Sequence, residues 1–143
     1  MSDILNLPAS LESLIPLHKF ISCKAENDKI PAMQVKRIEL VIEELIVNLV
    51  EHADLSKNSN VSIKWSIETD ARTNKRQCVL HIHDWSHEFN PLTAPPPDIS
   101  ADIDRRAIGG LGLHFVRTMS DACVYNRYNN TNILRLAFNL PCE

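Results

Sequence analysis

One long amphipathic segment constrains the fold of this chain of 143 residues more than any other feature. Pro31 is well placed as the first residue of a helix, and apolar residues recur at helical spacing through residue 53. These positions are Val35, Ile38, Val41, Ile42, Leu45, Ile46 and Leu49. Because a helix with one apolar face must bury that face against another layer, the segment predicts a layered core.

The rest of the chain predicts strands and two more helices around this segment. An extended start at 4–10 precedes a helical pattern over 11–25, which Pro16 weakens. Alternating patterns predict two antiparallel hairpins, one formed by residues 60–69 with 77–85 and the other by 123–128 with 132–140. A periodic pattern predicts a late helix over residues 111–122. The order predicts an α+β fold, a two-layer sandwich with helices on one face of a mixed, largely antiparallel sheet.

Composition limits the kind of protein this can be. With 44% apolar residues, residues 1–143 are predicted to form a single domain. The net charge is −3 without a long basic run, so direct nucleic-acid binding is not expected. We find no pattern for a signal peptide or a membrane span, and the four cysteines lack paired spacing, so the sequence predicts a cytoplasmic protein with reduced thiols and no membrane partner.

All three glycines of the chain lie in one turn, at Gly109, Gly110 and Gly112. A Pro- and Asp-rich stretch at 91–106, predicted to be an irregular loop, leads into this turn, and the predicted helix 111–122 follows it. Glycines at a loop-to-helix junction allow close backbone approach to an anion such as phosphate. The turn matches neither the P-loop nor the dinucleotide pattern, and a simple tight turn that caps the helix is the alternative.

Two polar residues lie one helical turn apart in the long amphipathic segment. Glu44 and Asn48 share a face, at the margin of the apolar stripe, so both are predicted to face the edge of a cleft. An amide oxygen can ligate Mg²⁺, and a carboxylate one turn away can accept a proton from an attacking hydroxyl. The alternative is a solvated glutamate beside a structural asparagine.

The strand at 77–85 ends its inward-facing row with a carboxylate. Asp84 has the same parity as Cys78, Leu80 and Ile82, and could accept a hydrogen bond from the amino group of a buried ligand. The alternative is an aspartate that begins a turn. Nearby histidines at 81, 83 and 87 suggest a metal site, but without matching cysteine or carboxylate spacing we expect them to be exposed on the sheet.

The order of three segments is more specific than any one of them. EELIVNLVEHA, IHDWSHEFNP and GGLGLHFVRTMSD resemble the three boxes of the GHKL ATPase superfamily, and within it the bacterial anti-sigma-factor serine/threonine kinases. The resemblance spans nearly the whole chain and implies the Bergerat fold of a histidine-kinase-like ATPase domain, with ATP and Mg²⁺ as cofactors. It implies that Glu44 is the general base, Asn48 the Mg²⁺ ligand and Asp84 the acceptor for the adenine amino group.

The same resemblance implies a phosphate-binding region and an ATP lid at about residues 92–108. The residues expected to bind the nucleotide there are Arg105, Arg106, Gly109, Gly110, Leu111, Gly112 and Leu113. Ser86 stands near the adenine where the family usually has glycine. If that position needs a positive φ, serine costs roughly 1 kcal/mol and weakens nucleotide binding.

The resemblance further implies a kinase that phosphorylates an anti-sigma-factor antagonist and sequesters a sigma factor. One alternative is a protein-binding module without phosphotransfer, which Ser86 favours; another is ATP hydrolysis without a protein substrate. Leu40, Val47 and Val50 lie opposite the main apolar stripe of their helix, and form either a partner or homodimer surface or a second core contact.

Overall fold

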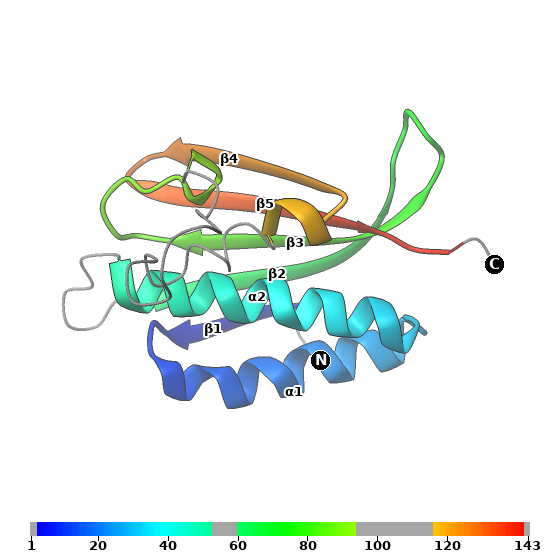
Figure 1. The fold of residues 1–143 in the computed structure, drawn as a ribbon, viewed down its shortest axis with the longest axis horizontal. Helices are drawn as coiled ribbons and strands as arrows, with labels where there is room; N and C mark the ends of the chain where they lie inside the picture. The colour runs from blue at the N-terminus through cyan, green and yellow to red at the C-terminus, as the bar shows by residue number, and fades with distance from the viewer. Residues whose placement is uncertain (1–2, 53–59, 94–115, 142–143) are drawn as a thin grey trace, which may run out of the picture.

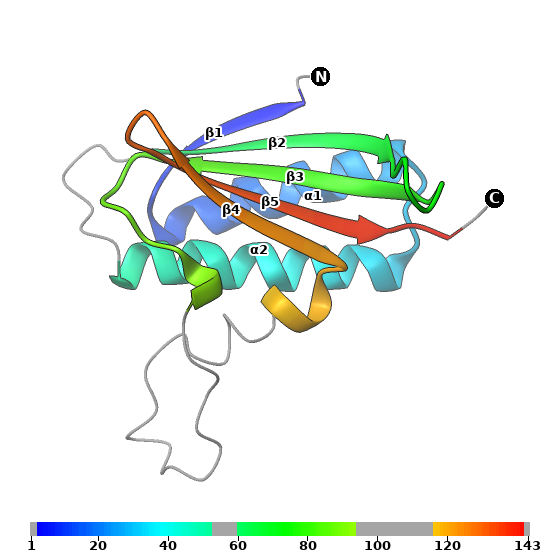
Figure 2. The same ribbon diagram turned by 90° about the horizontal axis from the view of Figure 1, so that it is seen from above.

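The computed structural model describes residues 3–52, 60–93 and 116–141 of the chain. Figures 1 and 2 show two layers, with helices α1 and α2 on one face of a five-stranded sheet. The elements are β1 (Ile4–Pro8), the 3-10 turn η1 (Leu11–Ser13), α1 (Leu14–Asn27), α2 (Ala32–His52), β2 (Asn60–Thr69), β3 (Arg76–Asp84), the 3-10 turn η2 (Pro91–Thr93), β4 (Ala122–Tyr128) and β5 (Thr131–Asn139). The α+β prediction is confirmed.

The sheet has the strand order β1-β2-β3-β5-β4, and each neighbouring pair that the structure describes is antiparallel. The last strand in sequence, β5, therefore lies between β3 and β4. Its register places Asn132 opposite Asp84 on one side and Arg127 on the other. This crossing brings the last hairpin beside the end of β3, where the candidate site lies.

Helix α2 buries the apolar stripe that the sequence predicts. Its six inner positions are at most 7% exposed: Ile38, Val41, Ile42, Leu45, Ile46 and Leu49. The helix begins at Ala32, one residue after the predicted start, and the Pro31 carbonyl accepts a hydrogen bond from the amide of Val35. No helix in the described ranges is long and apolar enough to cross a membrane.

Helix α1 tolerates Pro16 because this residue lies in the first helical turn, where a backbone N–H has no partner within the helix. The preceding turn η1 is capped by Ser10, whose side chain accepts a hydrogen bond from the amide of Glu12. Leu11 and Ile15 of the predicted apolar pattern are exposed, at 55% and 72%. The helix packs on the core instead through the residues Leu17, Phe20, Ile21 and Ala25.

Both predicted hairpins are present. Asn129 and Asn130 form the turn between β4 and β5 with φ of 49° and 59°, the left-handed region that asparagine tolerates better than most residues. The helix predicted over 111–122 is wrong at its C-terminal end, because helical residues stop at Met119. The amide of Asp121 already donates to the carbonyl of Ala137 on β5, so the chain has joined the sheet at that point.

Candidate functional site

A cavity between α2 and the sheet contains the described part of the candidate site. Apolar side chains make up most of its wall, with a few polar groups among them, which is the usual character of a small-molecule site. The lining residues are Leu45, Asn48, Leu49, Ile82, Asp84, Phe89, Pro91, Tyr125, Asn132 and Leu134.

Asp84 faces the inner layer, as its parity on the strand predicts, and is 8% exposed. Its Oδ1 accepts hydrogen bonds from the amide of Ser86 at 3.1 Å, the hydroxyl of Ser86 at 2.5 Å and the Nδ2 of Asn132 at 3.0 Å. Oδ2 accepts none from the described residues. Asp84 therefore presents one carboxylate oxygen that is available to a donor group of a ligand.

Ser86 is not strained by the loss of a glycine. It is absent from the non-glycine residues with positive φ in the described ranges, and its side chain is buried, with 7% of the residue exposed. The predicted conformational cost of about 1 kcal/mol for a left-handed serine therefore does not arise. Its hydroxyl instead adds a hydrogen bond to Asp84.

Asn132, at the start of β5, is a site residue that the sequence analysis missed. It is 3% exposed. Its Oδ1 accepts hydrogen bonds from Arg127 Nη1 at 2.9 Å and the hydroxyl of Tyr125 at 2.5 Å, while its Nδ2 donates to Asp84 and to the carbonyl of His87 at 3.0 Å. Because arginine can only donate and a carbonyl can only accept, these partners define one orientation of the amide.

A pattern in the sequence could have found Asn132. It has the same parity along β5 as the buried Leu134 and Leu136, so it had to face the inner layer. An uncharged polar residue at such a position needs partners within the fold. Tyr125 and Arg127 are on the inward side of β4 by the same argument, through their register with Leu134 and Asn132.

Asn48 lines the cavity from α2 and is 1% exposed. Its Nδ2 donates to the backbone carbonyl of Glu44 at 2.7 Å. Its Oδ1 is buried and has no hydrogen-bond partner in the described part of the chain. A buried acceptor without a partner costs about 1–3 kcal/mol, and a cation that prefers oxygen ligands would remove this cost. The residue therefore fits the predicted role of Mg²⁺ ligand.

Glu44 lies one turn before Asn48 at the half-buried edge of α2, and it is not among the residues that line the cavity. Burial raises the pKa of its carboxyl group above the ordinary glutamate value, and the negative charges of Glu43 and Glu51 raise this pKa further. A raised pKa makes a carboxylate a better proton acceptor at neutral pH.

The predicted phosphate-binding residues lie outside the described ranges. They are Arg105, Arg106, Gly109, Gly110, Leu111, Gly112 and Leu113. Of the predicted lid at about 92–108, the structure describes only the start, where Leu92 is part of η2.

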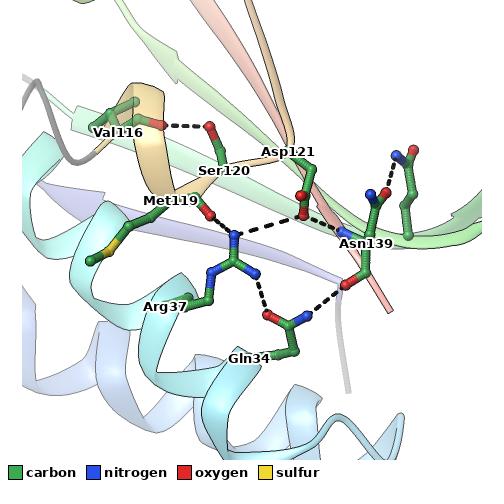
Figure 3. Close-up of polar contacts among 8 residues, drawn as sticks. Gln34, Arg37, Val116, Met119, Ser120, Asp121 and Asn139 are labelled. Carbon is green, nitrogen blue, oxygen red and sulfur yellow. Dashed lines mark hydrogen bonds and ion pairs between the residues drawn. The ribbon is translucent and has the colours of Figure 1, made fainter. Parts of the chain in front are cut away.

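The segment after the glycine turn is attached to α2 by the polar contacts in Figure 3. Arg37 Nη2 donates to the backbone carbonyl of Met119 and lies 3.9 Å from a carboxylate oxygen of Asp121. Gln34 accepts from the Nη1 of Arg37 at 2.8 Å and donates to the carbonyl of Asn139 at 2.8 Å. The helix that carries Glu44 and Asn48 therefore also holds the residues next to the candidate phosphate region.

The histidines of β3 do not form a metal centre. His81 and His83 face the outer side of the sheet, and no group of three or more histidine, cysteine or acidic residues in the described ranges could hold a metal ion. Partial burial lowers the pKa of His81, and the positive charge of Arg135 lowers it further.

The residues predicted to lie opposite the main apolar stripe of α2 have two different environments. Val50 packs against the core, as a second core contact would. Leu40 and Val47 are half-buried and are not part of the core cluster.

Comparison with known proteins gives a family and a fold. The family model for the histidine kinase-like ATPase domain matches residues 7–138. A structure of the RsbU and RsbW domains of Rv1364c from Mycobacterium tuberculosis aligns with 96% of the chain at a TM-score of 0.61 and 11% identity. The chain spans 32% of that structure's chain, about a third.

A second structure, the histidine kinase AdeS from Acinetobacter baumannii, aligns with 98% of the chain and 68% of its own at a TM-score of 0.44 and 14% identity. Among curated proteins, no sequence matches this chain.

Proposed function

Because this chain belongs to the histidine kinase-like ATPase domain family, we propose that it is an ATP- and Mg²⁺-dependent serine/threonine kinase that phosphorylates an anti-sigma-factor antagonist and sequesters a sigma factor. ATP binding is what the family implies. The observation that carries the nucleotide site is the cavity in which Asp84 Oδ2 and Asn48 Oδ1 lack partners among the described residues. The anti-sigma part of the proposal rests on the resemblance of the three sequence segments, and the structure of the RsbU and RsbW domains shares the fold.

Three polar residues have a chemical role in this proposal. Asp84 Oδ2 accepts a hydrogen bond from the adenine amino group, and Asn48 Oδ1 ligates Mg²⁺. The ion, when bound, neutralises charge on the phosphates. Glu44 accepts the proton of the substrate hydroxyl as its oxygen attacks the γ-phosphorus and ADP leaves. The raised pKa of Glu44 supports this assignment.

The product phosphate also accounts for a switch between partners. A phosphoserine adds nearly two negative charges to the interface at neutral pH, so the phosphorylated antagonist binds less tightly and leaves. The chain is then free to bind the sigma factor. Leu40 and Val47 are our candidates for a partner surface or a homodimer contact on α2.

A protein-binding module without phosphotransfer is the main alternative, and Ser86 is the residue that favours it. The unstrained backbone of Ser86 and its hydrogen bond to Asp84 support the nucleotide-binding proposal instead. The two candidate functions differ in whether the γ-phosphate of ATP is transferred to another protein.

The proposal is tested by calorimetry with ATP, with and without Mg²⁺, followed by transfer of labelled γ-phosphate to candidate antagonist proteins. We expect Asn48→Ala to lose most of the Mg²⁺-dependent part of ATP affinity. Glu44→Gln should keep affinity and lower the transfer rate by about 10²–10⁴-fold, as expected for a lost general base.

Three results would contradict the proposal or one of its assignments. Absence of binding at millimolar ATP would favour the protein-binding module. Transfer by Glu44→Gln at the wild-type rate would remove Glu44 from the mechanism, and an equal loss of ATP affinity in both variants would indicate a purely structural pair.

A further inference from the structure

The contacts around Asp84 extend to residues that have no assigned role in the nucleotide site. We infer that Asn132 and Ser86 are positioning residues that determine its base selectivity, because they hold the Asp84 carboxylate in one orientation. This inference rests on the proposed nucleotide-binding function. The inference concerns which purine base the site binds. It also concerns how this chain selects that base with Ser86 where the family usually has glycine.

The orientation of Asp84 is fixed by the unequal use of its two oxygens. A carboxylate oxygen has about two lone-pair positions, and Oδ1 already accepts from three donors within 3.1 Å. Rotating the plane of the carboxylate away from this position would break these charge-assisted bonds in a buried setting, where their loss is costly. Oδ2 is therefore the oxygen that meets a ligand.

Asn132 is itself held from the opposite side. Arg127 Nη1 and the Tyr125 hydroxyl both donate to its Oδ1, at 2.9 Å and 2.5 Å. Reversing the amide would place its NH₂ group against these donors and its carbonyl against the Asp84 carboxylate. Arg127 also donates to the carbonyl of Ser86 at 3.2 Å, so one guanidinium contacts both positioning residues.

A carboxylate oxygen fixed in this way selects between purines by their 6-substituent. Adenine offers an amino donor at that position, which an acceptor can bind. Hypoxanthine has a carbonyl oxygen at that position. The carboxylate repels this oxygen, and neither group then has a hydrogen-bond donor. A carboxylate that is free to turn would adapt to other donor patterns and discriminate less.

The experiment compares ADP with IDP, which differ in the 6-substituent and in the proton on N1, by calorimetry in the presence of Mg²⁺. We expect the wild type to favour ADP, and Asn132→Ala to lower the ADP-to-IDP affinity ratio by roughly tenfold or more, the scale expected for one lost hydrogen bond to a charged group. Ser86→Ala should lower the ratio in the same direction. Asn126→Ala, an exposed residue on β4, should leave it unchanged.

The ADP-to-IDP affinity ratio distinguishes a loss of positioning from a general loosening of the fold, because a loosened fold lowers both affinities together. Variants that bind ADP more weakly but keep the wild-type ratio would overturn the inference. If Asn132→Ala fails to fold, Ser86→Ala decides the question alone. If the wild type favours ADP and both variants keep the wild-type ADP-to-IDP ratio, the inference is wrong while the proposed function stands. If the wild type binds neither nucleotide, both the inference and the proposed function are wrong.

Discussion

At the scale of single residues, Glu44 and Asn48 show how one helical turn separates two environments. Asn48 is almost fully buried, and its unpaired Oδ1 belongs to a residue of the cavity wall. Glu44 is half-buried beside two other glutamates on the same helix. Holding a negative charge there costs stability, which is a common feature of residues kept for chemistry.

The raised pKa of Glu44 predicts a pH-dependent gain of stability for Glu44→Gln. Since the folded chain holds this proton more tightly than the unfolded chain, wild-type stability falls as the pH rises past the ordinary glutamate value of about 4.3. The variant avoids this loss, so its advantage should be absent below about pH 4 and present at pH 7. Solvent screening limits the gain to about 1 kcal/mol or less.

Urea unfolding of both proteins between these pH values measures the effect. Glu26→Gln, at an exposed position on α1, controls for the loss of one negative charge from the chain. A Glu44→Gln variant that is no more stable than the wild type at pH 7 would show that the carboxylate is not disfavoured in the fold.

Other residues show what the sequence alone could supply. Asp84 and Asn48 were found because parity and helical spacing place single polar residues beside an apolar row. The bonds of Asn132 could not be derived in the same way, since they join β5 to β3 and β4 across a strand order that local patterns do not specify. The roles of Glu44, Asn48 and Asp84 remain predictions.

At the scale of elements, Arg37 links α2 to the short helical segment 116–119 and to the start of β4. We predict that Arg37→Met lowers the free energy of unfolding by about 1–3 kcal/mol, because the carbonyl of Met119 loses its charged donor while the aliphatic stem is retained. Amides of residues 116–121 should exchange hydrogen faster.

Urea unfolding and hydrogen exchange test this link. Arg72→Met, in the exposed hairpin turn between β2 and β3, is the matched control and should change stability by less than about 0.5 kcal/mol. Unchanged stability and exchange in Arg37→Met would mean that the cluster in Figure 3 does not hold the two elements together.

Element type was easier to predict than element ends. The stripe of α2 and the alternation in β2 are strong repeating patterns, and the structure confirms both. The helix ending at Met119 was predicted three residues too long, because local periodicity continues to Ala122 while pairing with β5 already begins at Asp121. The C-terminal end of this helix is therefore set by strand pairing and not by the local sequence pattern.

At the scale of the whole molecule, the walls of the cavity come from both layers, so a ligand bound there would be linked to the stability of the fold. A ligand that binds only the folded chain stabilises it by about 2.7 kcal/mol at a hundredfold excess over its Kd. We therefore expect Mg²⁺·ADP to raise the melting temperature by several degrees.

Thermal unfolding over a series of ADP concentrations checks this expectation, with Mg²⁺ alone as the control. A melting temperature that does not depend on ADP concentration would contradict binding within the fold.

The position of β5 also has a consequence during synthesis. A ribosome releases the N-terminal part of a chain first, and helices α1 and α2 with the β2–β3 hairpin can begin to associate as they emerge. Strand β3 then has an open edge until residues 131–139 have been synthesised, because its second neighbour is β5. A nascent chain that stalls before Thr131 has Asp84 but lacks Asn132 and Leu134, so the wall of the cavity is incomplete until β5 has been synthesised.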